Sequence, residues 1–307
     1  MQILAGVGAA SVELGGYFAG GSSAGGELSS IDKITFPEDT KSTLAATLST
    51  GRSGNGGAAD SGVAGYSAGG FDTANISGID KITFSADTKS TLAGTLTTAR
   101  NALAGMANSG TAGYFGGGSD AGGRVSGIDK IAFPADTKST LAGTLTSPRN
   151  ALGAMANSGT AGYFAGGFDG TNYLSGIDKI TFSSDAKSTL AATLSSVRRE
   201  MNGMANSGTA GYYGGGADNS GNLSGIDKIT FSNDSRSTLA ATLSTARRNA
   251  AAMANTGTAG YFGGGFDTAR ISAIDKITFS NDAKTTLSAT LTVANQAGTA
   301  FANCGVL

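Results

Sequence analysis

Apolar and polar residues alternate along this chain in short runs of strand length. Between Arg100 and Leu145, four apolar segments are separated by Gly, Ser, Asn and Asp, which favour tight turns. The pattern predicts strands A to D near Ala102–Ala107, Ala112–Gly116, Ile128–Phe133 and Ser139–Leu145. The segment ADTKST, between the predicted strands C and D, has the composition of a type I hairpin turn.

The four-strand pattern occurs six times. A tyrosine leads an aromatic and glycine-rich phrase such as YFGGG in each unit, at Tyr17, Tyr66, Tyr114, Tyr163, Tyr212 and Tyr261. The phrase IDKITF places an aspartate at Asp32, Asp80, Asp129, Asp178, Asp227 and Asp275. An arginine recurs at Arg52, Arg100, Arg149, Arg198 and Arg247, and Asn295 takes the sixth slot. Such a repeat predicts an all-β protein, a six-bladed β-propeller of four-stranded antiparallel blades.

The repeats define one domain over residues 1–307. Their approximate bounds are 3–51, 52–99, 100–148, 149–197, 198–246 and 247–294, with 295–307 as a closing strand. Two segments fit strand A of the first blade, near Ala5 to Ala10 and from Ala297 to Asn303. Because one terminus usually completes the blade of the other, we expect the C-terminal segment to close the ring. The first dozen residues would then be displaced as an arm, and the reverse arrangement stays open.

A helical repeat is the alternative fold, because the segments between strands D and A contain many good helix formers. Gly105 and the strand-like phrases on both sides disfavour a helix there. Two-helix repeats would also not explain why GYFGGG and IDKITF recur in every unit. The propeller is therefore the expected fold.

The unit resembles the kelch repeat. The matching features of one unit are Tyr114, Gly116–Gly118, Ile128–Phe133, the ADTKS turn and Arg149. The resemblance covers nearly the whole chain and implies propeller blades. A leucine replaces the tryptophan that is usual at the start of the fourth strand, at Leu44, Leu92, Leu141, Leu190, Leu239 and Leu287. In style, the Gly, Ala, Ser and Thr-rich repeats are similar to kelch-like proteins of bacteriophages and environmental bacteria.

Charge and composition exclude several classes of function. The formal net charge is -1 and Lys and Arg are scattered, so we expect no nucleic acid partner. No apolar run approaches the ~18 residues of a membrane span, and the opening MQILAGVGAASVELGG lacks the basic start of a signal peptide. The chain has no histidine and a single cysteine, Cys304. We therefore expect no enzyme, no catalytic residue, no cofactor and no metal site.

The repeated charges have two interpretations. One is a set of charged rings that serve a ligand on the propeller axis. We favour the other, in which Asp32 and its equivalents hold backbone amides or the neighbouring arginine in each blade. Such pairs would contribute about 0–1 kcal/mol each if exposed.

Differences between the units separate scaffold from recognition. The C–D turns hardly vary, whereas the B–C loops differ in length and sequence, for example FDGTNYLS and ADNSGNLS. B–C and D–A connections of a propeller emerge on one face, so we expect ligands there. The candidate ligand-binding residues are Phe71, Asp72, Asp120, Phe168, Asp169, Asn172, Tyr173, Asp218, Asn219, Phe266 and Asp267. Aromatic planes beside Asp and Asn suit sugar rings, although the same residues are common in plain turns.

These features predict a non-enzymatic structural or binding module. We expect a phage virion component, such as a tail, fibre or nozzle protein, that presents the variable face to a host glycan or to another virion protein. The alternative is a bacterial scaffold that binds a protein partner through the same face. The virion or an extracellular location is favoured, a cytoplasmic one stays open, and a homo-oligomer or a virion assembly is compatible with the repeats.

Overall fold

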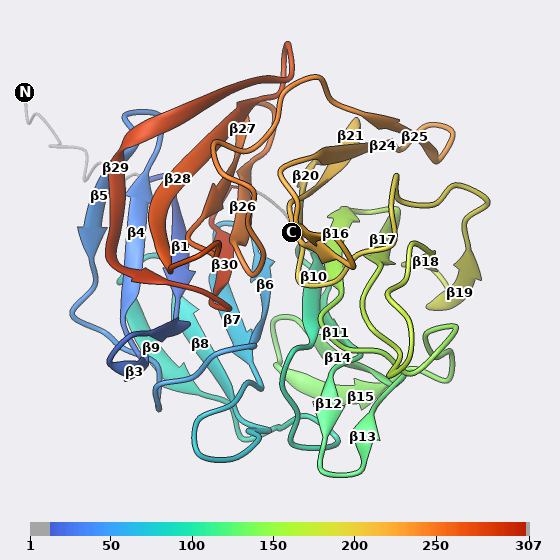
Figure 1. The fold of residues 1–307 in the computed structure, drawn as a ribbon. Coiled ribbons are helices and arrows are strands. Elements are labelled where there is room, and N and C mark those ends of the chain that lie inside the picture. The colour runs from blue at the N-terminus through green and yellow to red at the C-terminus, as the bar shows by residue number, and fades with distance from the viewer. Residues whose placement is uncertain (1–12, 305–307) are drawn as a thin grey trace, which may run out of the picture.

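The computed structural model describes residues 13–304 and has six four-stranded antiparallel sheets around a central axis (Figure 1). No helix occurs among these residues. The predicted all-β, six-bladed propeller is therefore confirmed, and the helical alternative is wrong. In each sheet the strands run from the innermost, A, to the outermost, D. The innermost strands of successive blades lie against one another and form the wall of the axis.

The bounds of the strands repeat closely. Blade 1 contains β30 (Thr299–Ala302), β1 (Gly15–Ala19), β4 (Ile31–Thr35) and β5 (Thr40–Thr43). Blade 2 contains β6 (Gly56–Asp60), β7 (Ala64–Ala68), β8 (Ile79–Thr83) and β9 (Thr88–Thr91). Blade 3 contains β10 (Ala104–Asn108), β11 (Ala112–Gly116), β14 (Ile128–Ala132) and β15 (Thr137–Thr140).

The other three blades follow the same order. Blade 4 contains β16 (Gly153–Asn157), β17 (Ala161–Ala165), β18 (Ile177–Thr181) and β19 (Ala186–Thr189). Blade 5 contains β20 (Asn202–Asn206), β21 (Ala210–Gly214), β24 (Ile226–Thr230) and β25 (Ser235–Thr238). Blade 6 contains β26 (Ala251–Asn255), β27 (Ala259–Gly263), β28 (Ile271–Thr278) and β29 (Ala283–Asn295). Short hairpins occupy three B–C loops, namely β2 (Ser22–Ser23) with β3 (Gly26–Glu27), β12 (Ser119–Asp120) with β13 (Gly123–Arg124), and β22 (Ala217–Asp218) with β23 (Gly221–Asn222).

The C-terminal segment closes the ring. Strand β30 pairs antiparallel with β1, so that Phe301 lies opposite Tyr17. The side chain of Asn303 then ties the two ends together, because its Oδ1 accepts a hydrogen bond from the Gly15 amide at 2.8 Å. The C-terminal segment thus takes the strand-A position that two segments of the sequence fit. The expected N-terminal arm, residues 1–12, lies outside the described residues.

Strand D of blade 3 is shorter and starts earlier than the sequence pattern predicts. In blade 3 it covers Thr137–Thr140 rather than Ser139–Leu145, and the turn ends at Asp136. Strand D pairs with strand C only as far as Thr140, which lies opposite Asp129. After that residue the chain leaves the sheet and Leu145 enters the core between blades. The predicted ADTKST turn is therefore only partly correct, because its last four residues form the strand.

The leucine in the tryptophan slot is not the main core residue of this segment. The leucine four residues later is about 3% exposed in every blade, at Leu48, Leu96, Leu145, Leu194, Leu243 and Leu291. Among the leucines in the tryptophan slot, only Leu141 is buried in the core, at 9% exposure. The other five are partly buried and pack against the edges of the core clusters.

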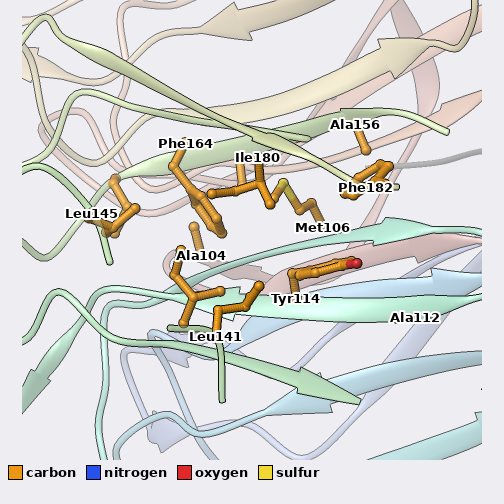
Figure 2. Packing of buried hydrophobic residues seen from close by; sticks show 13 residues of the cluster. Ala104, Met106, Ala112, Tyr114, Leu141, Leu145, Ala156, Phe164, Ile180 and Phe182 are labelled. Carbon is orange, nitrogen blue, oxygen red and sulfur yellow. The ribbon is translucent and has the colours of Figure 1, made fainter. Parts of the chain in front are cut away.

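Neighbouring blades interlock through large and small residues. Met106 of β10 points into the space over Gly162 of β17, where a Cβ atom would collide with the methionine sulfur. Figure 2 shows Met106 beside Phe182 and Tyr114 in this layer. The rings of Tyr114 and Phe182 stack with centroids 5.1 Å apart. Close packing of this kind fixes each blade relative to the next.

Candidate functional site

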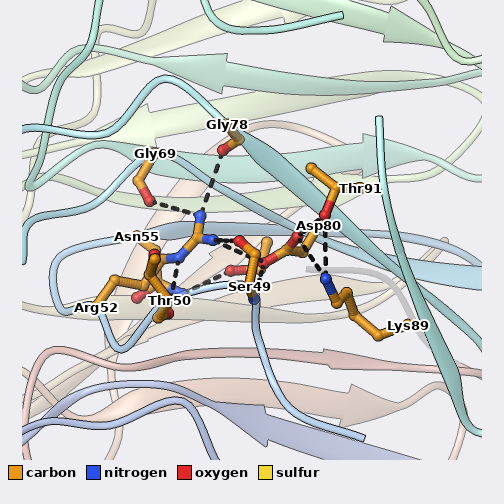
Figure 3. Close-up of polar contacts among 10 residues, drawn as sticks. Ser49, Thr50, Arg52, Asn55, Gly69, Gly78, Asp80, Lys89 and Thr91 are labelled. Carbon is orange, nitrogen blue, oxygen red and sulfur yellow. Dashed lines mark hydrogen bonds and ion pairs between the residues drawn. The ribbon is translucent and has the colours of Figure 1, made fainter. Parts of the chain in front are cut away.

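The repeated Asp and Arg residues form buried pairs away from the axis. Arg52 donates to Asp80 over 2.7 Å, and both side chains are almost fully buried (Figure 3). Asp80 also accepts a bond from the Ser49 amide at 2.8 Å, so strand C of blade 2 holds the D–A connection that precedes it. The same ion pair recurs in blades 3 to 6, at Arg100–Asp129, Arg149–Asp178, Arg198–Asp227 and Arg247–Asp275.

This arrangement confirms that the aspartates hold amides and arginines, but the pairs are buried rather than exposed. Their aspartates lie on strand C, the third strand from the axis, which leaves no charged ring around the channel. Blade 1 differs because Asn295 takes the arginine slot. There Asp32 accepts bonds from the Thr292 amide at 2.7 Å and the Thr43 hydroxyl at 2.6 Å.

The repeated Tyr and Lys also join neighbouring blades. The hydroxyl of Tyr163 donates to Asp234 Oδ1 at 2.9 Å, and Lys179 donates to Asp234 Oδ2 at 2.6 Å. Asp234 belongs to the C–D turn of the next blade and has a positive φ of 54°. Burial, and then the hydrogen bond to Asp234, raise the pKa of Tyr163 well above its usual value. The contact occurs at all six junctions and explains why the C–D turns hardly vary.

The B–C loops lie beside the D–A connections, as the propeller pattern predicts. Gly167 begins the B–C loop of blade 4, and its amide donates to the Arg198 carbonyl at 2.9 Å. Gly167 has a φ of 101°, and a Cβ atom there would lie 2.7 Å from the Asn150 carbonyl oxygen. The glycine doublet therefore allows the loop to approach the connection closely.

The structure places the eleven candidate residues in the B–C loops of five blades, where they form separate groups. Phe71 and Asp72 are exposed on blade 2, and Asp120 lies in the β12–β13 hairpin of blade 3. Phe168, Asp169, Asn172 and Tyr173 share the loop of blade 4. Asp218 and Asn219 lie in the β22–β23 hairpin of blade 5, and Phe266 and Asp267 in the loop of blade 6.

Arginines that the sequence analysis did not single out cover the aromatic rings of blade 4. The Arg124 guanidinium lies 4.5 Å from the centroid of the Phe168 ring. The Arg199 guanidinium lies 5.0 Å from the Tyr173 ring, which meets Phe168 edge to face at 5.4 Å. A cation in this position is attracted electrostatically to the face of the aromatic ring. The four side chains form one cluster from three blades, which we name the blade 4 cluster.

A second group joins blades 5 and 6. Arg248 lies 4.9 Å over the Phe266 ring and donates to Asn222 Oδ1 at 3.2 Å. The side-chain amide of Asn222 in turn donates to Asp267 Oδ1 at 3.3 Å. Asp267 is thus tied to a hydrogen-bond chain, and the face carries guanidinium, amide and carboxylate groups side by side.

Several candidate aspartates shape their own loops. Asp169 Oδ1 accepts bonds from the Thr171 and Asn172 amides at 2.8 and 2.7 Å. These backbone hydrogen bonds, with a smaller contribution from Arg124, hold the pKa of Asp169 below its usual value. Asp218 and Asp120 accept similar bonds within their hairpins. In each of these three aspartates the Oδ1 oxygen accepts the bond that stabilises the turn.

A ring of left-handed residues surrounds the axis on this face. It contains Gly54, Ala102, Ala151, Glu200, Asn249 and Ala297, with φ between 50° and 63°. The amide of one residue donates to the carbonyl of the preceding blade, as in Glu200 to Ala151 at 2.7 Å and Gly54 to Ala297 at 2.6 Å. A non-glycine residue held in this left-handed conformation costs about 1 kcal/mol or more, so the ring stores backbone strain at the mouth of the axis.

The mouth of the axis contains a cavity of about 230 Å³. Asparagines, Arg199 and Glu200 line it together with Leu103, Leu152 and Met201. Below it, the innermost strands leave only about 20 Å³, because Gly57 and Gly105 are in close contact. Over residues 13–304, the axis therefore narrows sharply below a polar bowl.

The residues that line this bowl were not among the predicted site residues. Arg199 and Glu200 directly follow the repeated Arg198. Arg248 is the equivalent of Arg199 in the next unit, but no other unit has a glutamate at the position of Glu200. That departure from the repeat was the available signal. Variable residues therefore occur in the D–A connections as well as in the B–C loops, on the same face.

Among residues 13–304, no group of three Cys, Asp or Glu side chains is placed to hold a metal ion. Burial raises the pKa of the Cys304 thiol to about 11. Over the same residues, no helix is long and apolar enough to cross a membrane. In comparisons with known proteins, no family model and no curated protein matches this chain.

Proposed function

We propose that this chain is a non-enzymatic binding module, a kelch-like propeller that serves as a tail, fibre or nozzle component of a phage particle. Its variable face, formed by the B–C loops and D–A connections, binds a glycan on the host surface. The observation that carries this proposal is that side-chain diversity falls on one face of a frame whose other contacts repeat at every junction. Rigid scaffolds commonly carry recognition on such loops.

The chemistry of the face supports a glycan ligand. Phe71 is 38% exposed and offers an open ring face beside Asp72. Asp169, Asn172 and Asn219 add exposed or half-exposed acceptors and donors in the loops of blades 4 and 5, on the same face of the ring. A sugar presents apolar C–H faces and hydroxyl groups, which match aromatic planes and amide or carboxylate groups.

A bacterial scaffold that binds a protein partner is the second candidate. It is favoured by the arginines over Phe168, Tyr173 and Phe266, because they occupy ring faces on which a sugar would stack. Arg and aromatic side chains are also enriched at the centres of protein interfaces.

A glycan array probed with the purified full chain tests the proposal. We expect binding to a glycan that is weakened in Phe168→Ala and Asp169→Ala and retained in Val63→Ala, a control in an exposed turn between strands A and B. Absence of binding to every glycan would contradict the glycan proposal and favour the protein scaffold. Capsid or tail genes beside the coding sequence would support the virion role, and a neighbourhood without virion genes would contradict it.

A further inference from the structure

We infer that the cavity at the mouth of the axis is a subsite for a single sugar ring, held between Asn55 of blade 2 and Glu200 with Arg199 of blade 5. This inference rests on the proposed function. It places one end of the glycan at residues outside the B–C loops. Blades 2 and 5 are three places apart in a ring of six, so their side chains approach the cavity from opposite sides.

Size and shape favour one small, compact ligand. The cavity holds about 230 Å³ and narrows sharply below. This volume is smaller than the roughly 300–1,000 Å³ of most small-molecule sites. A single ring fits, with the rest of a glycan leaving through the open mouth toward the B–C loops. Leu103 and Met201 give part of the wall an apolar character that suits the C–H face of a sugar.

Asn55 is the first departure from the repeat. The equivalent residues of the other blades are Leu103, Leu152, Met201, Ala250 and Gly298. Asn55 is only 5% exposed, and its side-chain amide donates to Ser67 at 2.8 Å, another polar residue where the other blades have Phe or Tyr. Its Oδ1 atom accepts no hydrogen bond from the described residues, although Asn55 lines the cavity. A buried acceptor without a partner is costly, so this position is explained by a donor supplied by a ligand.

Glu200 is the second departure, on the opposite side. It is a glutamate in the strained axial ring, where three other blades have alanine. Its carboxylate lies 3.0 Å from Arg248 Nε and 3.7 Å from Arg199 Nε. Arg199 Nε and Glu200 Oε2 make no well-aligned hydrogen bond to the described residues, and both side chains line the cavity. Glu200 thus offers acceptors, and Arg199, held by the Tyr173 ring, offers donors.

These groups match the hydroxyl pattern of a sugar. Each hydroxyl donates one hydrogen bond and accepts up to two, so a ring with adjacent hydroxyls can donate to Asn55 and Glu200 while it accepts from Arg199. The charged side chains that line the cavity are one guanidinium, of Arg199, and one carboxylate, of Glu200, so the charge of the lining is balanced, which favours a neutral sugar. A sugar acid is the alternative that the experiment separates.

The test measures binding of methyl glycosides to the full chain by saturation-transfer NMR and calorimetry. The panel contains the methyl glycosides of glucose, galactose, mannose, N-acetylglucosamine, rhamnose and glucuronic acid. We expect one or more neutral glycosides to bind, and Asn55→Leu and Glu200→Ala each to weaken that binding about tenfold or more. Both substitutions introduce residues found at equivalent positions of other blades. Val63→Ala should bind like the parent chain.

A double variant tests whether misfolding, rather than loss of the polar contact, explains a loss of binding. Asn55→Leu with Ser67→Phe gives blade 2 the Leu and Phe pair of blades 3 and 4, and it should also lose binding while its melting temperature stays near that of the parent. If glycans bind and Phe168→Ala removes binding while the Asn55 and Glu200 variants bind normally, the subsite is wrong and the proposed function stands. Preference for the glucuronic acid glycoside alone overturns the neutral-sugar assignment. If no glycoside and no array glycan binds, both proposals fail.

Discussion

The sulfur of Met155 occupies the space that a Cβ atom on Gly211 would need. Met155 lies on innermost strand β16 of blade 4, and Gly211 lies on β21 of blade 5. Equivalent contacts join Met106 to Gly162, Met204 to Gly260 and Met253 to Gly16, and Phe301 takes the methionine place over Gly65. Absence of a side chain on one blade therefore makes room for a long side chain from the next.

Gly211→Ala should destabilise the protein by about 1–3 kcal/mol, because the added methyl group overpacks the junction between blades 4 and 5. Urea unfolding measures this loss. Gly225→Ala is the matched control, because a Cβ atom there meets no other atom within 4 Å and the backbone has no positive φ. It should change stability by no more than about 0.5 kcal/mol. Equal losses at both glycines would show that the methionine contact is not the cause.

Asp178→Asn should cost about 3–5 kcal/mol, because it leaves the Arg149 guanidinium buried without its carboxylate. Asp32→Asn is the matched variant in blade 1, where the sixth arginine slot holds Asn295. Its cost should be about 1–3 kcal/mol, because Asp32 has hydrogen bonds from Thr292 and Thr43 and an ion pair with Lys41 at 3.6 Å, but no buried arginine. Chemical unfolding of both variants compares the two values. A larger loss at Asp32 would contradict the view that the buried arginine dominates.

Acid should destabilise the protein through the same aspartates. Burial alone would raise the pKa of Asp129, but hydrogen bonds from Thr97, together with Arg100 and Thr140, outweigh it and hold that pKa below the usual value. Asp178 behaves in the same way through Thr146 and Arg149. Because a lowered pKa in the folded state stabilises the protein above the unfolded value of about 4, stability should fall as the pH drops below that value. Melting temperatures measured against pH check this, and a flat profile from neutral pH to pH ~2 would contradict it.

Alkali should act through the tyrosines at the blade junctions. Burial, and then the hydrogen bond to an aspartate, raise the pKa of Tyr114 and Tyr212 well above the usual value. The unfolded chain loses these protons near pH ~10, so the stabilisation is complete below that pH and is lost as the pH rises further. Ultraviolet absorbance of tyrosinate should therefore increase together with unfolding measured by circular dichroism. Gradual ionisation of all tyrosines in a folded protein would contradict the buried junctions.

Much of the frame could be predicted because the same residues form the same strands and turns in each unit. Strand B was placed correctly at Ala112–Gly116, since a tyrosine, small residues and a glycine doublet delimit it. Strand D was misplaced by several residues, because its end is decided by pairing with strand C at Asp129 and Thr140 and not by its own composition. The Leu145 side chain belongs to a core that only forms between two blades.

The location of the candidate site could be predicted from the sequence, but the full set of its residues could not. The loops with Phe168 and Asp169 were found because they vary between units. Arg124 lies in one of these variable loops but was not singled out, whereas Arg199 and Glu200 lie in a D–A connection. Their contacts join residues from different blades, as when Arg124 of blade 3 and Arg199 of the connection to blade 5 meet the ring of Phe168. No local pattern contains such a contact.

The sequence by itself determined the number of blades, the order of their strands and the face on which they differ, because each of these follows from a period and from residues close together in the chain. The tertiary structure decided that β30 closes the ring at β1, that the Arg and Asp pairs are buried, and that Asn55 and Glu200 line the same cavity. These features depend on closure of the ring, which brings together residues that are far apart in sequence and fixes which polar groups lose water.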